Sequence, residues 1–327
     1  MGSPKEREGL NPRNALEDEP FPMPYLLLTL TVLFWSGNFV LGRGINDIIP
    51  PVSLAFWRWV GAFMVLLPFA IRPLIRDWKT IRDHLAIMAV LAVLSVTFFN
   101  TFIYLALQST PVANTVLVNA MTPVFIVFIS WVGFHESIKP IQGIGVAISL
   151  SGLLWMLSRG NLTALLSTRF STGDLWTLAA AMSWALYTVL LRKRPPGLHP
   201  VAFLATTMGI GILFLIPPYI WELRTGASFD LSPTTLSSIV YVAVFPSVLS
   251  FLFWNWSVAI VGATKAGVFV YLMPVFSIAL AYVFLGEVLQ AYHLFGIILI
   301  FSGIYLTTTA KFPFSRTAGA PDQPKPL

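Results

Sequence analysis

The sequence predicts an all-α polytopic membrane protein whose ten transmembrane helices form two inverted five-helix repeats. Hydrophobic residues make up 56% of its 327 residues, whereas charged residues make up only 10%. Soluble proteins carry about 25% charged residues, and the mean hydropathy of this chain is +0.78. Apolar runs of roughly 20 residues recur along the chain, a pattern typical of membrane-spanning helices and not of the shorter, alternating strands of membrane barrels.

Ten apolar runs follow one another between two polar tails. The tails, residues 1–24 and 311–327, are rich in proline or acidic residues and are expected to be disordered. A first five-helix repeat is predicted at 25–158 and a second at 174–310. The ten spans cover residues 25–42, 52–71, 84–107, 112–134, 140–158, 174–191, 200–221, 236–258, 263–285 and 290–310.

The distribution of lysine and arginine predicts the orientation in the membrane. If the N-terminus is cytoplasmic, the inside segments hold fourteen basic residues and the outside segments hold four. Cytoplasmic loops carry the excess of basic residues in membrane proteins. We therefore expect a protein of the cell (inner or plasma) membrane, in contact with membrane lipid, with both termini cytoplasmic.

The two halves of the chain repeat each other. At a spacing of 151 residues, Pro123-Val124-Phe125 matches Pro274-Val275-Phe276, and at a spacing of 149 residues Trp35 matches Trp184. Each half holds five spans, an odd number, so the second half must lie inverted relative to the first. Inverted repeats are typical of secondary transporters, which bind substrate near the bilayer midplane between the halves.

Glycines also recur between the halves. Gly145 and Gly152 match Gly296 and Gly303 at the spacing of 151 residues, and each pair is one heptad apart. Small residues at such intervals allow helices in membranes to approach closely. The fifth and tenth spans are therefore expected to pack tightly against a neighbouring helix.

Each half ends in a proline-containing helix, a short turn with glutamate (His135-Glu136 and Gly286-Glu287) and a helix that closes with Ser-Gly. Together with FWSGNF at 34–39 and SWALY at 183–187, these features resemble the EamA branch of the drug/metabolite transporter superfamily. The resemblance covers residues 25–310 and is strongest to the YddG-type aromatic amino-acid exporters. It implies the export of small metabolites.

Polar and aromatic side chains fall at helical spacing inside six of the predicted spans and are expected to line one partly wet cavity. Aromatic walls would bury an apolar substrate side chain, while asparagines meet the charged backbone of an amino acid. In the alternative interpretation, the hydroxyl groups bond to their own helices and the aromatic residues belong to the core or the membrane interface. The predicted substrate-binding residues are Trp35, Asn38, Asn100, Tyr104, Asn119, Trp184, Tyr187, Trp254, Lys265 and Tyr271.

Two prolines and two basic residues fall inside the spans. Pro123 and Pro274 remove a helical hydrogen bond at matching places, which predicts a hinge or, alternatively, a static kink. Lys265 is either a cation beside the cavity that attracts a carboxylate or a plain helix-end charge. Arg58, between Trp57 and Trp59, is either another such cation beside the cavity or, in the preferred interpretation, a side chain that snorkels to a lipid headgroup.

The sequence lacks the motifs of other functions. There is no Walker A motif, so no ATP hydrolysis by this chain and no ATPase partner are implied. The chain has no cysteine and no His-Glu-x-x-His motif, and its four histidines lie at predicted span ends, so we expect no metal, no cofactor and no catalytic residue. Its low charge content also excludes a nucleic-acid partner.

These observations predict a transporter that exports amino acids with aromatic or large apolar side chains by alternating access. Lipophilic cations are the alternative substrates, and an intramembrane enzyme is the alternative class. All fourteen acidic residues lie in tails, loops or span ends, whereas proton-driven pumps use carboxylates or histidines buried at mid-membrane. Movement driven by the substrate gradient is therefore predicted.

Overall fold

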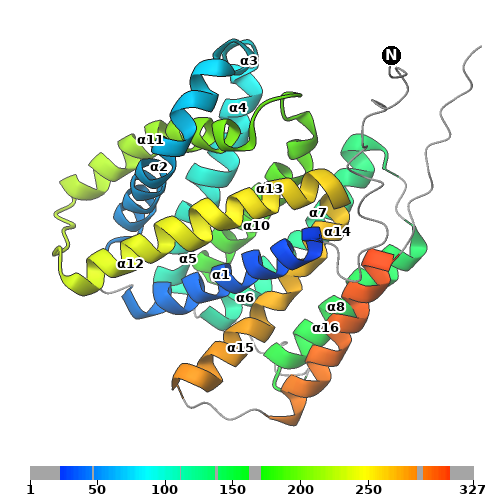
Figure 1. Ribbon diagram of the computed structural model, residues 1–327. Helices are drawn as coiled ribbons and strands as arrows, with labels where there is room; N and C mark the ends of the chain where they lie inside the picture. Colours follow the sequence, from blue (N-terminus) through cyan, green and yellow to red (C-terminus); the bar gives the residue numbers. More distant parts are fainter. Residues whose placement is uncertain are drawn as a thin grey trace, which may run out of the picture.

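The computed structural model describes residues 23–45, 48–110, 112–136, 139–161, 171–285 and 290–309, in which every regular element is a helix (Figure 1). The first half contains α1 (Met23–Ile45), α2 (Pro51–Arg76), α3 (Trp78–Asp83), α4 (Leu85–Ala92), η3 (Val93–Phe98), α5 (Phe99–Ser109), α6 (Val112–Asn119), α7 (Thr122–Phe134) and α8 (Pro140–Leu157). The second half contains α10 (Thr172–Leu190), η4 (Leu191–Lys193), α11 (Pro200–Arg224), α12 (Pro233–Ala243), η5 (Val244–Leu249), α13 (Ser250–Val261), α14 (Ala263–Gly267), η6 (Val268–Tyr271), α15 (Leu272–Leu285) and α16 (Ala291–Thr309). Residues 1–22 and 310–327, which hold nearly all of both predicted tails, and the predicted turn at Gly286-Glu287 lie outside the described residues.

Within the described ranges, eight helical stretches are long and apolar enough to cross a membrane. Two shorter apolar stretches, Met23–Phe39 and Thr122–Phe134, accompany them. Nine of the ten predicted ranges coincide with one of these stretches to within about five residues, whereas the range 112–134 is divided between α6 and α7 by a break at 120–121. Large apolar side chains such as Phe69 and Trp221 are exposed on the outer surface, as contact with lipid requires.

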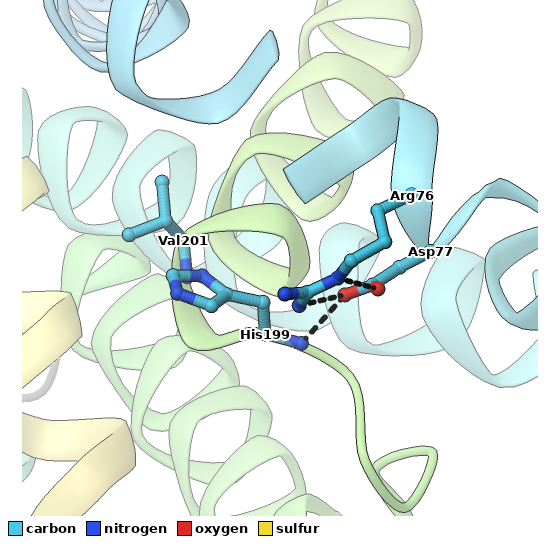
Figure 2. Close-up of polar contacts among 4 residues, drawn as sticks. All are labelled: Arg76, Asp77, His199 and Val201. Carbon is cyan, nitrogen blue, oxygen red and sulfur yellow. Dashed lines mark hydrogen bonds and ion pairs between the residues drawn. The ribbon is translucent and has the colours of Figure 1, made fainter. Parts of the chain in front are cut away.

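The helices α2 and α11 lie side by side (Figure 1). A carboxylate beside the end of each helix accepts N–H groups at the start of the other. Glu222, near the end of α11, accepts the backbone N–H groups of Val52 at 2.9 Å and Ser53 at 2.6 Å. Asp77, which follows α2, accepts the backbone N–H of His199 at 2.9 Å, directly before α11 (Figure 2). The first N–H groups of a helix lack helical partners, so these carboxylates fix both ends of the helix pair.

Asp77 is also held by its neighbour in the chain. The Nε and Nη2 atoms of Arg76 donate hydrogen bonds to its two carboxylate oxygens at 2.8 and 3.2 Å (Figure 2). The Arg76 hydrogen bond and, second, the N–H of His199 stabilise the charged carboxylate, and they hold the pKa of Asp77 below its ordinary value.

Interruptions of the helices recur at the spacing of 151 residues that the sequence shows. The two π-helical segments η3 and η5 start at Val93 and Val244, and α8 and α16 start at Pro140 and Ala291. The break between α6 and α7 at 120–121 corresponds to the end of η6 and the start of α15 at 271–272. Matching sequence therefore gives matching local structure in the two halves.

The glycine pattern brings α8 and α16 together, and the two helices lie side by side in Figure 1. Gly145 lies against Gly303, and Gly152 lies against Gly296. A methyl group on Gly152 would lie only 2.7 Å from the carbonyl oxygen of Gly296. Only glycine permits this approach, which is the close packing that the heptad spacing predicts.

Candidate functional site

Three tryptophans from α1, α10 and α13 meet inside the helix bundle, and all three are buried. The ring centroid of Trp35 lies 5.0 Å from that of Trp184 and 5.2 Å from that of Trp254. Phe251 and Phe99 extend this group, with centroids 5.3 and 4.8 Å from that of Trp184. Aromatic residues from both halves of the chain thus form one cluster, which we call the aromatic cluster.

A narrow pocket adjoins the aromatic cluster. Five of the ten predicted substrate-binding residues line this central pocket, and they come from four helices, α1, α5, α6 and α10. The lining residues are Trp35, Asn38, Phe39, Arg58, Phe99, Asn100, Asn119, Thr122, Trp184, Phe251, Val270 and Met273.

A second pocket of about 230 Å³ continues from the first, because Asn119, Val270 and Met273 line both. Its walls include Tyr271, another predicted site residue, and Pro274. These residues surround the break between α6 and α7 and the matching irregular segment η6. The pockets therefore lie where the helices are discontinuous.

Two buried tyrosine–asparagine pairs are related by the internal repeat. The hydroxyl of Tyr104 donates to Asn38 Oδ1 at 3.4 Å, and the hydroxyl of Tyr187 donates to Asn255 Oδ1 at 2.6 Å. In sequence, Tyr187 follows Asn38 by 149 residues and Asn255 follows Tyr104 by 151 residues. The two halves therefore contain the same pair with the partners exchanged.

Arg58 does not snorkel to the membrane surface, so that interpretation of the sequence is wrong. Its side chain is 2% exposed and lines the central pocket. Its Nε donates to Ser247 Oγ at 2.6 Å, its Nη1 to Tyr104 Oη at 3.1 Å and its Nη2 to the Pro246 carbonyl oxygen at 3.1 Å. The side chain turns inward because α5 and η5 supply these acceptors.

Several buried polar atoms around the two pockets have no hydrogen-bond partner among the described residues. They are Nε1 of Trp184 and Trp254, Oδ1 of Asn119, Nδ2 of Asn255 and the hydroxyl of Tyr271. Buried polar atoms of folded proteins are nearly always paired with protein, water or ligand. Of these atoms, Trp184 Nε1 and Asn119 Oδ1 belong to lining residues of the central pocket and the Tyr271 hydroxyl to a lining residue of the second pocket, so these three groups can meet a polar occupant.

Three predicted residues lie elsewhere than the sequence suggested. Lys265 lies half-buried on α14 and lines neither of the two pockets. Pro123 lies in the first turn of α7, directly after the break at 120–121, and Pro274 lies in the first turn of α15, where the 3-10 segment η6 passes into that helix. Proline is tolerated there because the first N–H groups of a helix have no helical partner.

Hydroxyl groups on the predicted cavity faces bond largely to their own helices. Thr31 donates to the Leu27 carbonyl at 2.8 Å, and Thr177 donates to the Gly173 carbonyl at 3.0 Å. For such residues the structure favours the alternative interpretation, in which the helix backbone satisfies the side chain.

Seven of the twelve lining residues were not among the predicted substrate-binding residues, among them Arg58, Phe99 and Phe251. The repeat contains the signal for Phe251, because it follows the predicted residue Asn100 by 151 residues. No comparable pattern points to Phe99.

The described residues form only helices, and eight helical stretches have the length and apolar composition to cross a membrane, which defines the class as a multi-pass membrane protein. The chain belongs to the EamA-like transporter family, which matches it twice, over residues 22–158 and 171–309. It is therefore a membrane transporter and not an enzyme.

Related proteins match nearly the whole chain. An uncharacterized transporter of Archaeoglobus fulgidus is 29% identical over 88% of this chain and 98% of its own length. A probable terminal-alkyne amino-acid exporter of Streptantibioticus cattleyicolor is 27% identical over 90% of this chain and 96% of its own. A protein of known crystal structure shares the fold, with a TM-score of 0.70 at 20% identity. The match covers 87% of this chain and 96% of the other chain.

Proposed function

We propose that this transporter exports amino acids with aromatic or large apolar side chains. The observation that carries the proposal is the central pocket, which combines aromatic walls with asparagine amides and the unpaired indole N–H of Trp184. Aromatic rings bury an apolar side chain, and the amides hydrogen-bond the charged backbone of an amino acid. The relative described as an amino-acid exporter supports the same substrate class.

The ring contacts of the aromatic cluster support alternating access as the mechanism. Trp35, Trp184 and Trp254 pack directly on one another, so an occupant of amino-acid size requires these rings to part. Discontinuous helices line the substrate sites of inverted-repeat transporters, where one repeat moves against the other. In this proposal the breaks before Pro123 and Pro274 are the points of flexing.

The proposed architecture is ten transmembrane helices in two inverted repeats, residues 25–158 and 174–310. The spacing of 151 residues between matching breaks and helix starts supports this arrangement, as does the odd number of spans in each half. The distribution of basic residues supports cytoplasmic termini. Reporter fusions at both ends should be labelled only from the cytoplasmic side; one terminus on the outside would exclude the five-plus-five arrangement.

Transport by the purified protein in proteoliposomes tests the substrate class. We expect counterflow of labelled phenylalanine, tryptophan or leucine, and none of labelled nucleobases or cationic drugs. Protein-free liposomes measure leakage. Transport of the cationic drugs without any amino acid would contradict the proposal and establish the multidrug alternative.

A further inference from the structure

Arg58 is a buried cation that faces the central pocket without an anionic partner. The three hydrogen-bond acceptors of its guanidinium, Ser247, Tyr104 and the Pro246 carbonyl, are all neutral. Among the described residues no carboxylate forms an ion pair with it. A guanidinium carries more N–H donors than these three acceptors use, so donors remain for a ligand in the pocket.

A charge in such a place is expensive unless something completes its coordination. Burying an ionised group costs several kcal/mol unless it is paired and hydrogen-bonded. A neutral side chain such as glutamine would hydrogen-bond Tyr104 and Ser247 without that cost. The positive charge of Arg58 is therefore not explained by linking α2 to α5 and η5.

The second half of the chain lacks this cation. The repeat that matches Pro51-Val52 with Pro200-Val201 places Thr207 opposite Arg58. Thr207 is buried, and its hydroxyl donates to the carbonyl oxygens of Phe203 at 3.2 Å and Leu204 at 2.9 Å, within its own helix. The positive charge therefore lies on one side only of a site to which the two halves otherwise contribute matching residues.

We propose that Arg58 binds the carboxylate of the transported molecule, so that the transporter selects substrates with a free carboxylate. This inference rests on the proposed function and names the group that the site recognises. Arginine suits the role because its planar fork matches a carboxylate with two parallel hydrogen bonds.

The remaining groups of the pocket fit the rest of an amino acid. Asn119 Oδ1 is a buried acceptor with no partner among the described residues, and it lines the same pocket as Arg58, where it can accept from an ammonium group. The rings of Trp35, Trp184 and Phe251 line the same pocket and cover an apolar side chain. A lipophilic cation would instead meet a buried positive charge, which repels it.

Competition by matched analogues tests the assignment in proteoliposomes that exchange labelled phenylalanine. Phenylalanine methyl ester lacks the carboxylate, and 3-phenylpropionate keeps it but lacks the ammonium group. For the wild-type protein we expect phenylalanine and 3-phenylpropionate to compete, and the ester to compete at least tenfold more weakly. Arg58→Gln should lower phenylalanine exchange at least tenfold and bring the affinities for acid and ester close together.

The controls separate binding from folding. Arg72→Gln removes the same charge from an exposed position of the same helix and should behave as the wild type. If Arg58→Gln does not fold, as judged by size-exclusion chromatography and thermal unfolding, the Arg58→Lys variant is tested instead. It should weaken the binding of phenylalanine at least threefold and leave the binding of the methyl ester unchanged. If Arg58 had a purely structural role, the substitution would weaken the binding of acid and ester equally. That result would overturn the inference.

The outcomes also separate the inference from the proposed function. If the Arg58→Gln variant still exchanges phenylalanine and still prefers the acid to the ester, the proposed role of Arg58 is wrong. Amino-acid transport is then unaffected as a proposal. If the wild-type protein transports 3-phenylpropionate but not phenylalanine, and this transport is inhibitable and is lost in Arg58→Gln, amino-acid transport is wrong. The carboxylate site is then supported. A wild-type protein that neither binds nor transports any carboxylate probe overturns both.

Discussion

The carbonyl oxygen of Pro246 joins the aromatic and the cationic parts of the proposed site. It accepts hydrogen bonds from Trp35 Nε1 and from Arg58 Nη2, both at 3.1 Å. The π-helical segment η5 therefore fixes an indole from α1 and a guanidinium from α2 relative to each other. π-helical turns occur frequently at functional sites, and here the turn positions both ends of the pocket.

Replacing Trp35 tests the aromatic cluster. Trp35→Ala removes its packing on Trp184 and Trp254 and the hydrogen bond to Pro246, so the apolar wall of the pocket is lost. We expect phenylalanine exchange in proteoliposomes to fall at least tenfold. Ile298→Ala, at an exposed position of α16, should leave exchange unchanged; equal losses in the two variants would contradict the site.

At the scale of helices, the contact between α8 and α16 depends on glycine. Gly152→Ala places a methyl group against the Gly296 carbonyl and Leu299, which forces the helices apart. Overpacking of this kind costs about 1–3 kcal/mol, so thermal unfolding in detergent should begin at a lower temperature. Gly143→Ala, on the same helix but with open space around it, should leave the unfolding temperature unchanged or slightly higher. A stable Gly152→Ala variant would contradict the close approach.

The cap that Asp77 provides to α11 predicts a dependence of stability on pH. Hydrogen bonds from Arg76 and His199 lower the pKa of Asp77 in the folded protein, so its contribution is complete above the ordinary value near 3.9. That contribution is lost as the pH falls through the lower, folded-state pKa. Asp77→Asn should therefore lower the thermal unfolding temperature at pH 7.

Thermal unfolding from pH 7 down to pH 3 checks this expectation. The difference between the wild type and Asp77→Asn should be constant at neutral pH and shrink toward acid pH. Asp83→Asn removes an exposed carboxylate nearby and serves as the control. A difference that grows toward acid pH would contradict the assigned direction of the pKa shift.

At the scale of the whole molecule, the positions of the buried carboxylates bear on energy coupling. Two carboxylates of the described chain are buried, Asp174 and Glu222, and both accept backbone N–H groups at helix starts. Neither lines the central pocket. A proton relay requires an ionisable group along the substrate path, so we expect the substrate gradient to drive transport.

Proteoliposomes with an imposed pH gradient test this expectation. Labelled phenylalanine should equilibrate at the same level with and without the gradient, and an excess of unlabelled phenylalanine inside should drive counterflow in both cases. An ionophore that collapses the gradient provides the control. Accumulation several-fold above equilibrium under a pH gradient alone would show proton coupling and disprove facilitated transport.

Hydropathy and spacing were enough to place the helices and much of the pocket. Backbone groups in lipid must form their hydrogen bonds within the same segment, so a long apolar run that crosses the membrane is an α-helix. The predicted ranges accordingly lie on helices. Trp35, Asn38, Asn100, Asn119 and Trp184 were predicted because polar or aromatic residues at helical spacing mark an inward face. That inference needs no knowledge of the neighbouring helices.

The direction of the basic side chains depended instead on contacts between distant segments. Arg58 points inward because Ser247, 189 residues later in the chain, and Tyr104 supply acceptors there, while Lys265 lies outside the two pockets. A long cationic side chain reaches either lipid headgroups or the interior from the same helix position, and its partners decide between them. Those partners adjoin Arg58 only after the helices pack, so the sequence pattern identifies the embedded cations and the packed structure selects the one that faces the pocket.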